Sequence, residues 1–358
     1  MSAASTVQTS AMLQHRPGWR RIGLLPALIL LLLASMSLGA GIGSVAVPPD
    51  VISAILLKKI GILIDVPVST QQEAIFWMIR LPRVLLGMLV GAGMAVSGAL
   101  LQGIFRNPLA DPGLIGVSSG AALGAVAVIV FGLSSFGLMT LPLAAFLASA
   151  ATTFLVYRLA QRHGHTDVAT LLLVGLALNA LAGATTGLLT YLADDAQLRS
   201  IVFWTMGGLG GALWETLLAA APWIGLALLL ASRLGRALNL FALGESEARH
   251  LGIEVERVKR TVILLAALAT GAAVALAGPI GFIGLIVPHI VRLIAGPDHR
   301  LLLPACALGG ASLLVLADLL ARTMAAPAEI PVGLITAFAG GPFFLALILR
   351  ARRQYGWG

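Results

Sequence analysis

Charged residues are scarce in this chain. Asp, Glu, Lys and Arg make up 11% of its 358 residues, whereas hydrophobic residues make up 59%. A water-soluble domain carries about a quarter charged residues, because water must wet its surface. Residues 22–43 contain no charge at all, and about 20 apolar residues suffice for a helix to cross a bilayer. The composition therefore excludes an ordinary soluble domain and predicts a membrane-embedded protein.

Cysteine is nearly absent as well. The single cysteine, Cys306, lies within an apolar stretch, which excludes a disulfide framework and a cysteine-based metal site. The alternating segments of roughly ten residues that form a membrane β-barrel are also missing. The apolar stretches are instead continuous and rich in Ala, Leu and Gly, and only helices satisfy their own backbone groups within such a segment. We therefore expect transmembrane helices.

The hydrophobic pattern predicts an all-α polytopic membrane protein with ten transmembrane helices. The first segment is long enough to span the bilayer and is interpreted as an uncleaved helix rather than a signal peptide. The eighth is short and lies between Gly278-Pro279 and Gly296-Pro297. The expected segments are 22–44, 81–105, 113–132, 140–160, 168–191, 213–232, 258–278, 281–296, 301–322 and 331–350.

The basic residues form no single patch, so the net charge of +8 does not indicate a nucleic-acid partner. They stand at the ends of the apolar segments, as topology signals do. With both termini inside, 17 of the 23 Lys and Arg residues lie on the cytoplasmic side, the distribution that the positive-inside rule favours. The six outer residues are Lys58, Lys59, Arg80, Arg83, Arg199 and Arg322.

The chain shows no boundary between soluble domains. The predicted parts are a cytoplasmic N-terminal tail at 1–21, one transmembrane domain at 22–353 and a C-terminal tail at 354–358. The outer loop 45–79 is long, and we expect a surface helix around Pro48–Lys58. A second outer loop spans 192–212. The inner loop 233–257 is the most polar stretch and predicts one or two short helices.

Glycine pairs spaced four residues apart predict close helix contacts, because small residues let helix backbones approach each other. The pairs are Gly87 and Gly91, Gly120 and Gly124, and Gly183 and Gly187. We expect each pair to lie on a packing face.

An arginine pair opens the second apolar segment in Arg80-Leu81-Pro82-Arg83. Proline suits a first helical turn, and arginines three apart can share one face of a helix. Arg322 lies at the outer end of the ninth segment. Two interpretations are open: the arginines anchor the helices in lipid headgroups, or they receive acidic side chains of a soluble partner.

The inner loop contains a short charged helix around residues 244–252. A glycine break, acidic residues in the first turn and a closing glycine predict its limits. It is either a solvated connector or a surface that a motor subunit could grip.

The sequence contains no signature of an enzyme or an autonomous motor. A phosphate-binding Gly-x-x-x-x-Gly-Lys-Ser/Thr motif is missing, so any ATP that drives the protein binds to another chain. Gly116–Gly120 fits the hydrolase pattern G-x-S-x-G but starts a membrane helix rather than a strand-to-helix elbow. Ionisable residues within the segments are few, and Asp318, His289 and Arg292 all stand toward segment ends. An autonomous secondary transporter usually holds buried charges at mid-membrane, so this scarcity disfavours such a transporter.

Several segments together resemble the iron-siderophore, haem and cobalamin permease family of type II ABC importers. The resemblance extends from about Arg80 to Leu349 and rests on motifs in a fixed order. The motifs are Arg-Leu-Pro-Arg at 80–83, Ser97-Gly98 with Gln102, Arg-Asn-Pro-Leu-Ala-Asp-Pro at 106–112, Gly-Glu-x-x-Ala-x-x-Leu-Gly at 244–252, Gly-Phe-Ile-Gly-Leu-Ile-Val-Pro-His-Ile-Val-Arg at 281–292, Asp298-His299-Arg300, Leu303-Pro304 and Glu329-Ile330-Pro331-Val332-Gly333.

The resemblance implies a non-catalytic permease subunit in the bacterial inner membrane. It implies a homodimer of this chain above two ABC ATPase subunits, which bind ATP and Mg, and a periplasmic binding protein outside. This chain itself would bind no cofactor and no metal. Arg80, Arg83 and Arg322 match the arginines that receive glutamates of the binding protein. The residues that match the ATPase-coupling helices are Leu243, Gly244, Glu245, Glu247, Ala248, Arg249, Leu251 and Gly252.

The expected cargo is haem. The run from Leu192 to Arg199, with Ala182-Gly183-Ala184 before it, resembles the haem-importing branch. An iron-siderophore or cobalamin is the alternative cargo. The resemblance places Val168, Ala169 and Thr170 near the inner gate, and Arg199 is a candidate cation for the haem propionates along the pathway.

Overall fold

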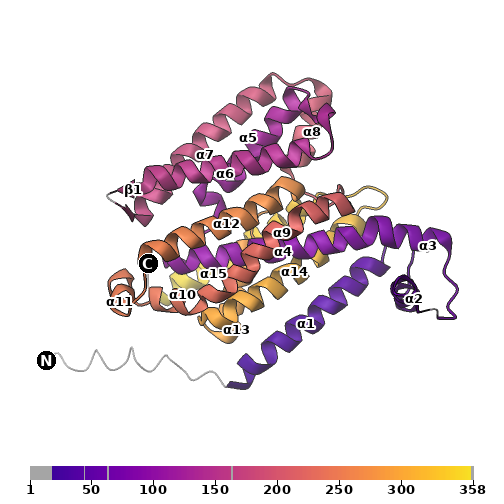
Figure 1. Cartoon of the computed structure of the whole chain (residues 1–358), viewed down its shortest axis with the longest axis horizontal. Helices are drawn as coiled ribbons and strands as arrows, with labels where there is room; N and C mark the ends of the chain where they lie inside the picture. Colours follow the sequence, from indigo (N-terminus) through magenta and orange to yellow (C-terminus); the bar gives the residue numbers. More distant parts are fainter. Residues whose placement is uncertain (1–17, 44, 63, 163, 356–358) are drawn as a thin grey trace.

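The computed structural model describes residues 18–43, 45–62, 64–162 and 164–355. Each of the ten predicted segments corresponds to a helix among these residues (Figure 1). Eight helices are long and apolar enough to cross a membrane, and α5 and α13 are shorter. The ten are α1 (Gly18–Gly41), α4 (Leu81–Phe105), α5 (Val117–Val130), α6 (Thr140–Ala160), α7 (Val168–Tyr191), α9 (Trp214–Ala231), α12 (Val255–Ala277), α13 (Ile283–Ala295), α14 (His299–Thr323) and α15 (Val332–Tyr355). Residues 1–17 and 356–358 of the predicted tails lie outside the described part of the chain.

The loops contain further short elements. The expected surface helix is α2 (Pro49–Lys59), and the inner loop forms α10 (Gly235–Phe241) and α11 (Glu245–His250). Two elements were not predicted: helix α8 (Asp195–Thr205) in the second outer loop, and a two-stranded antiparallel hairpin, β1 (Gln161–Arg162) and β2 (His165–Thr166). Single 3₁₀ turns occur at Pro112–Ile115, Leu133–Phe136 and Ser232–Leu234.

The second long helix begins earlier than the sequence predicted. It starts with α3 (Thr70–Ala74), continues through a π-helical turn at Ile75–Arg80 and runs on as α4, so that residues 70–105 form one helix of 36 residues. Ser69 caps this helix through the backbone N–H of Gln72. Pro82 therefore lies inside the helix, two residues after the end of the π-helical turn. Proline lacks a backbone N–H and so removes one hydrogen bond of a regular helix.

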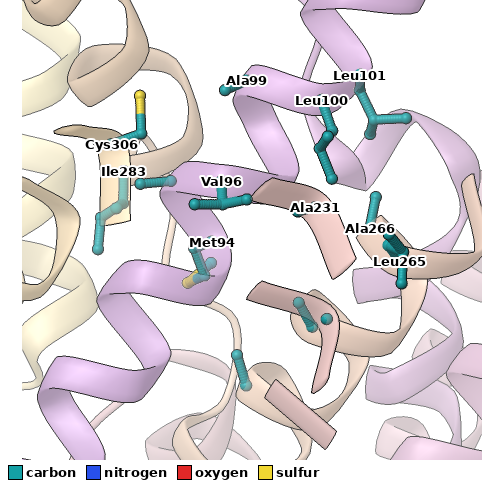
Figure 2. Packing of buried hydrophobic residues seen from close by; sticks show 14 of the residues in the cluster. Met94, Val96, Ala99, Leu100, Leu101, Ala231, Leu265, Ala266, Ile283 and Cys306 are labelled. Carbon is teal, nitrogen blue, oxygen red and sulfur yellow. The ribbon is translucent and has the colours of Figure 1, made fainter. Parts of the chain in front are cut away.

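Helix α4 lies at the centre of the molecule. It packs against α9, α12, α13 and α14, and 83% of the most apolar window of its helix is buried. Helices α5 to α8 form a separate group above α4 and α12 in the view of Figure 1, joined to the centre through α5 and α6 against α12. Figure 2 shows buried side chains from α4, α9, α12, α13 and α14 meeting in one apolar cluster.

Glycines permit the close packing around α4. A Cβ atom on Gly91 would lie 2.2 Å from the carbonyl oxygen of Gly310 on α14, and one on Gly98 would lie 2.0 Å from that of Gly284 on α13. Gly120 and Gly124 also pack tightly on α6, where an added Cβ would lie 2.5 Å from Thr152 Oγ1 and 2.5 Å from the carbonyl oxygen of Ala144 respectively.

The third predicted glycine pair behaves differently. Nothing in the described chain lies within 4 Å of a Cβ placed on Gly183 or Gly187. Those two positions of α7 therefore have no packing partner within the described part of this subunit.

We expect Gly98→Ala to destabilise the protein by about 1–3 kcal/mol, because the added methyl group would overlap the Gly284 backbone. Gly225→Ala on α9 is the matched control, since nothing lies within 4 Å of its Cβ position. The measurement is the apparent melting temperature of the purified protein in detergent, followed by tryptophan fluorescence. Equal melting temperatures for the two variants would contradict this account of the α4–α13 contact.

Candidate functional site

Two of the three predicted docking arginines hold the outer end of α1. The Arg80 side chain is buried, and its guanidinium donates to the carbonyl oxygens of Ala40 at 2.9 Å and Gly41 at 2.8 Å, and also to that of Val45. Arg322 donates to Ile42 at 2.9 Å and to Gly39. The last carbonyls of a helix lack partners within the helix and favour positive charge. The two arginines therefore close α1 at its C-terminus.

The third predicted docking arginine, Arg83, is the centre of an ion-pair network. It donates to both carboxylate oxygens of Asp318, with Nε–Oδ2 at 3.0 Å and Nη2–Oδ1 at 2.9 Å. It also donates to Glu329, with Nη1–Oε1 at 3.0 Å and Nη2–Oε2 at 2.9 Å. Arg322 Nε lies 3.7 Å from Asp318 Oδ2. The structure thus gathers Arg83 and Arg322 around one buried carboxylate.

The outer arginines differ in how accessible their partners are. The Asp318 side chain is 5% exposed, whereas the Glu329 side chain is 49% exposed. All three guanidinium groups are engaged by acceptors of the chain itself in this conformation. Docking of a partner on these arginines stays a prediction, and Arg83 is the one paired with a half-exposed carboxylate.

An outer cavity of about 450 Å³ adjoins this network. Its lining includes Arg83, Asp318 and Glu329, together with the glycine-rich loop 207–211 and with Phe203 and Trp204 of α8. The loop is held close to the ends of two helices, because the N–H of Gly208 donates to Ala277 of α12 and the N–H of Gly333 of α15 donates to Gly207.

The predicted coupling residues form α11 and its flanks. Gly244 and Gly252, with φ of 116° and 86°, bound the helix on either side, as their conformational freedom allows. Ala248 is fully buried and fixes the helix to the protein. Leu243 and Leu251 are 60% and 58% exposed. Exposed leucines beside exposed charges on Glu247 and Arg249 make a surface that a partner could cover.

The predicted gate residues lie at the start of α7 and on the same side of the molecule as α11. Asp167 caps α7 by accepting from the N–H of Thr170 at 2.7 Å and from its hydroxyl at 2.6 Å. These hydrogen bonds, led by that from the hydroxyl, lower the pKa of the Asp167 carboxyl below its usual value. Val168 and Ala169 line an inner cavity of about 680 Å³, and Glu245 and Arg249 of α11 line it too. The structure therefore brings two of the predicted gate residues and two of the predicted coupling residues to one cavity.

Arg199, the remaining predicted pathway residue, lies elsewhere. It is exposed on α8, beyond the opposite end of α7 from Val168. A helix of 24 residues rises about 36 Å, so Arg199 lies at the opposite end of α7 from the predicted gate residues and is remote from them.

Sequence reasoning did not assign a role to Asp318 or Glu329. The spacing of Asp318 and Arg322, four residues apart on one helix, is a signal that predicts an ion pair. Glu329 carries no comparable local signal, because its partner Arg83 is 246 positions away in the sequence. Among the described residues, no group of three or more His, Cys, Asp or Glu side chains could hold a metal ion.

Comparison with known proteins assigns the fold. The model of the FecCD transport family matches residues 27–350. In solved structures, a metal-chelate type ABC transporter in an inward-facing conformation superposes with a TM-score of 0.80 at 36% identity, covering 92% of this chain and 99% of the other. The architecture is that of an ABC importer permease. This chain belongs to the FecCD transport family.

Named relatives agree with this assignment. The hemin transport system permease protein HmuU of Yersinia pestis is 54% identical over 282 residues, which cover 78% of this chain and 84% of the relative. The cobalamin import system permease protein BtuC of Halobacterium salinarum is 49% identical over 283 residues, covering 78% and 75%. The chain is thus a multi-pass membrane permease subunit of an importer and not an enzyme. Its family membership implies ATPase and binding-protein partners.

We expect Asp318→Asn to destabilise the protein by about 3 kcal/mol or more, because it leaves the buried charges of Arg83 and Arg322 without their shared carboxylate. Glu329→Gln, at the half-exposed end of the same network, should cost less than about 1 kcal/mol. The apparent melting temperature of each variant in detergent measures its loss of stability. A Glu329→Gln variant that is less stable than Asp318→Asn would contradict the assignment of the buried partner.

Proposed function

We propose that this permease imports haem. Of the two named relatives, the hemin permease is the more similar, at 54% identity against 49% for the cobalamin permease. Haem is a flat, apolar molecule with two propionates. The outer cavity offers apolar side chains such as Trp204 and Leu276, and exposed Arg199 supplies a cation on the outer side. Cobalamin or an iron-siderophore is the alternative cargo for the same class of importer.

The proposed assembly contains two copies of this chain and two ATPase subunits. Support for the homodimer comes from α7, where Gly183 and Gly187 have open space around them and only 17% of the apolar window is buried. Small residues on a membrane helix allow the backbone of another helix to approach. Such a surface suits a second copy of this chain.

We place the protein in a bacterial inner membrane with both termini in the cytoplasm. The positive-inside distribution of Lys and Arg supports this orientation. It puts the inner loop with α11, and the start of α7, on the side of the ATPases. The arginine network and the outer cavity then face the periplasm.

Docking of the binding protein would use the surface above Arg80, Arg83 and Arg322. Carboxylates of the partner would replace Glu329 on Arg83, and this exchange is inexpensive because an exposed ion pair contributes little. Complementary charge would set the orientation and the rate of encounter more than the affinity. Arg80 and Arg322 would transmit the contact to α1, whose last carbonyls they bind.

On the inner side, the ATPases would grip Leu243, Leu251 and the charged face of α11. ATP binding would then shift the permease pair between inward-open and outward-open states by favouring one of them. An autonomous secondary transporter is the competing function. It would need no ATPase and would follow an ion gradient.

The cargo is tested by uptake into proteoliposomes that contain this chain, its ATPase and its binding protein. We expect ATP-dependent accumulation of haem, and none of vitamin B12 or a ferric siderophore. Uptake of vitamin B12 instead would show that the cargo is cobalamin, and the assignment as an importer would still stand. Uptake that follows an ion gradient without the ATPase would favour the secondary transporter.

The docking surface is tested with Glu329→Gln. Removing the internal competitor for Arg83 should raise the affinity of the binding protein for the transporter a few-fold, about the scale of an exposed ion pair, measured by the concentration that half-maximally stimulates ATPase activity. Glu215→Gln, an exposed carboxylate at the first turn of α9, is the matched control. Lower affinity for Glu329→Gln would show that Glu329 itself contacts the partner.

A further inference from the structure

Lys259, in the second turn of α12, is a lysine buried to 3% exposure. Burying an ammonium group is costly unless it is paired and hydrogen-bonded. Its Nζ donates to Glu245 Oε2 at 2.7 Å and to the carbonyl oxygen of Thr166 at 2.8 Å, and lies 3.6 Å from Glu256 Oε1. The three acceptors come from α11, from β2 and from α12 itself.

The bond to Thr166 is half of a two-sided clamp. The N–H of Thr166 donates to Glu256 Oε2 at 2.9 Å, while its carbonyl accepts from Lys259. The first turns of α12 thus hold both backbone groups of Thr166. The next residue, Asp167, is the N-cap of α7, so the clamp fixes the point at which α7 begins.

The bond to Glu245 extends the clamp to the coupling helix. Glu245 is the first residue of α11, and its side chain is 36% exposed. Within the described ranges, no hydrogen bond or ion pair runs directly between α11 and α7, whereas Lys259 binds both α11 and the residue before the α7 cap. Figure 1 shows the hairpin, α11 and the start of α12 at the same end of the molecule.

We propose that Lys259 is the positioning residue that couples movement of α11 to the entrance of α7. The proposal rests on the proposed function, in which an ATPase moves α11. Displacement of Glu245 pulls on Lys259 or releases it, and the carbonyl of Thr166 follows. The inner cavity of about 680 Å³, lined by Glu245, Lys259 and Val168, provides room for that movement beside the gate.

The coupling role and a purely structural role predict different results. If Lys259 only stabilised the fold, its loss would lower ATP hydrolysis and cargo uptake together, in proportion to the transporter that assembles. If Lys259 transmits movement, hydrolysis continues and uptake fails. The number of ATP molecules hydrolysed per cargo molecule therefore separates the two roles.

The experiment uses the complete transporter in proteoliposomes, with haem as the cargo, or vitamin B12 if the wild type carries that instead. We expect Lys259→Met to lower uptake about tenfold, a typical scale for coupling between sites, while ATPase activity per assembled complex stays within about twofold. Lys259→Arg should restore most of the coupling, because arginine keeps a charge that can reach Glu245 and Thr166. Glu245→Gln, like Lys259→Met, should raise the number of ATP molecules hydrolysed per cargo molecule.

Arg257→Gln is the matched control. Arg257 lies two residues before Lys259 and pairs with Glu254 at 3.0 Å, and both side chains are about two-thirds exposed, at 67% and 69%. This variant should leave the ATP cost per cargo unchanged. An unchanged cost in Lys259→Met would overturn the proposal. If Lys259→Met does not assemble, an unchanged cost in Glu245→Gln overturns it. Wild-type complex without any ATP-driven uptake would overturn the proposed function and the coupling role with it.

Discussion

The direct backbone contact between α4 and its neighbours is the constraint on which the other features depend. In a bilayer the hydrophobic effect does not hold helices together, so close packing and polar contacts must do so. Gly91 and Gly98 bring α14 and α13 against α4. The same approach allows Gln102 of α4 to donate to the carbonyl of Gly284 at 2.9 Å and to accept from Arg292 at 2.6 Å. It also sets α14 at the distance at which Asp318 meets Arg83.

The two ends of the molecule use buried charge in different ways. At the outer end, one buried carboxylate serves two arginines, and an exposed glutamate completes the network. At the inner end, one buried lysine serves acceptors from three elements. Each arrangement joins segments that are distant in the sequence. A charge in low dielectric holds its partners strongly and is costly to leave unpaired, so each network ties together the segments at its end of the molecule.

Much of this architecture follows from the sequence, because hydrophobic length is a direct signal in a membrane protein. All ten segments were predicted, as were α2 and the short helices of the inner loop. Helix α8 was missed because only 11 residues form it and its first turn is polar, although Asp194 and Gln197 form a capping box that the spacing could have indicated. The early start of the second helix was missed because Pro82 suggested a helix N-terminus.

The candidate sites were predictable in position but not in their partners. The resemblance to the family selected the candidate arginines, the candidate coupling helix and the candidate gate residues, and their roles stay predictions. The motifs did not indicate that Glu329 would form an ion pair with Arg83, or that Lys259 would bind Glu245 and Thr166. Lys259 looked like one of many cytoplasmic basic residues, because burial is a property of the folded chain. Pairing across 93 or 246 positions is decided by helix packing, which local sequence patterns do not report.

The central place of α4 has a consequence for biosynthesis. Helix α14, which packs along α4 and supplies Asp318 to it, begins about 190 residues after α4 ends. At about 5–20 residues per second, the ribosome needs roughly 10 to 40 seconds to deliver it. During that time α4 is in the membrane with its glycine face and Arg83 uncovered. Helices α9 and α12 also pack against α4 and are made before α14, so they can cover part of it earlier. Slower elongation lengthens the time for which the side of α4 that faces α14 stays open.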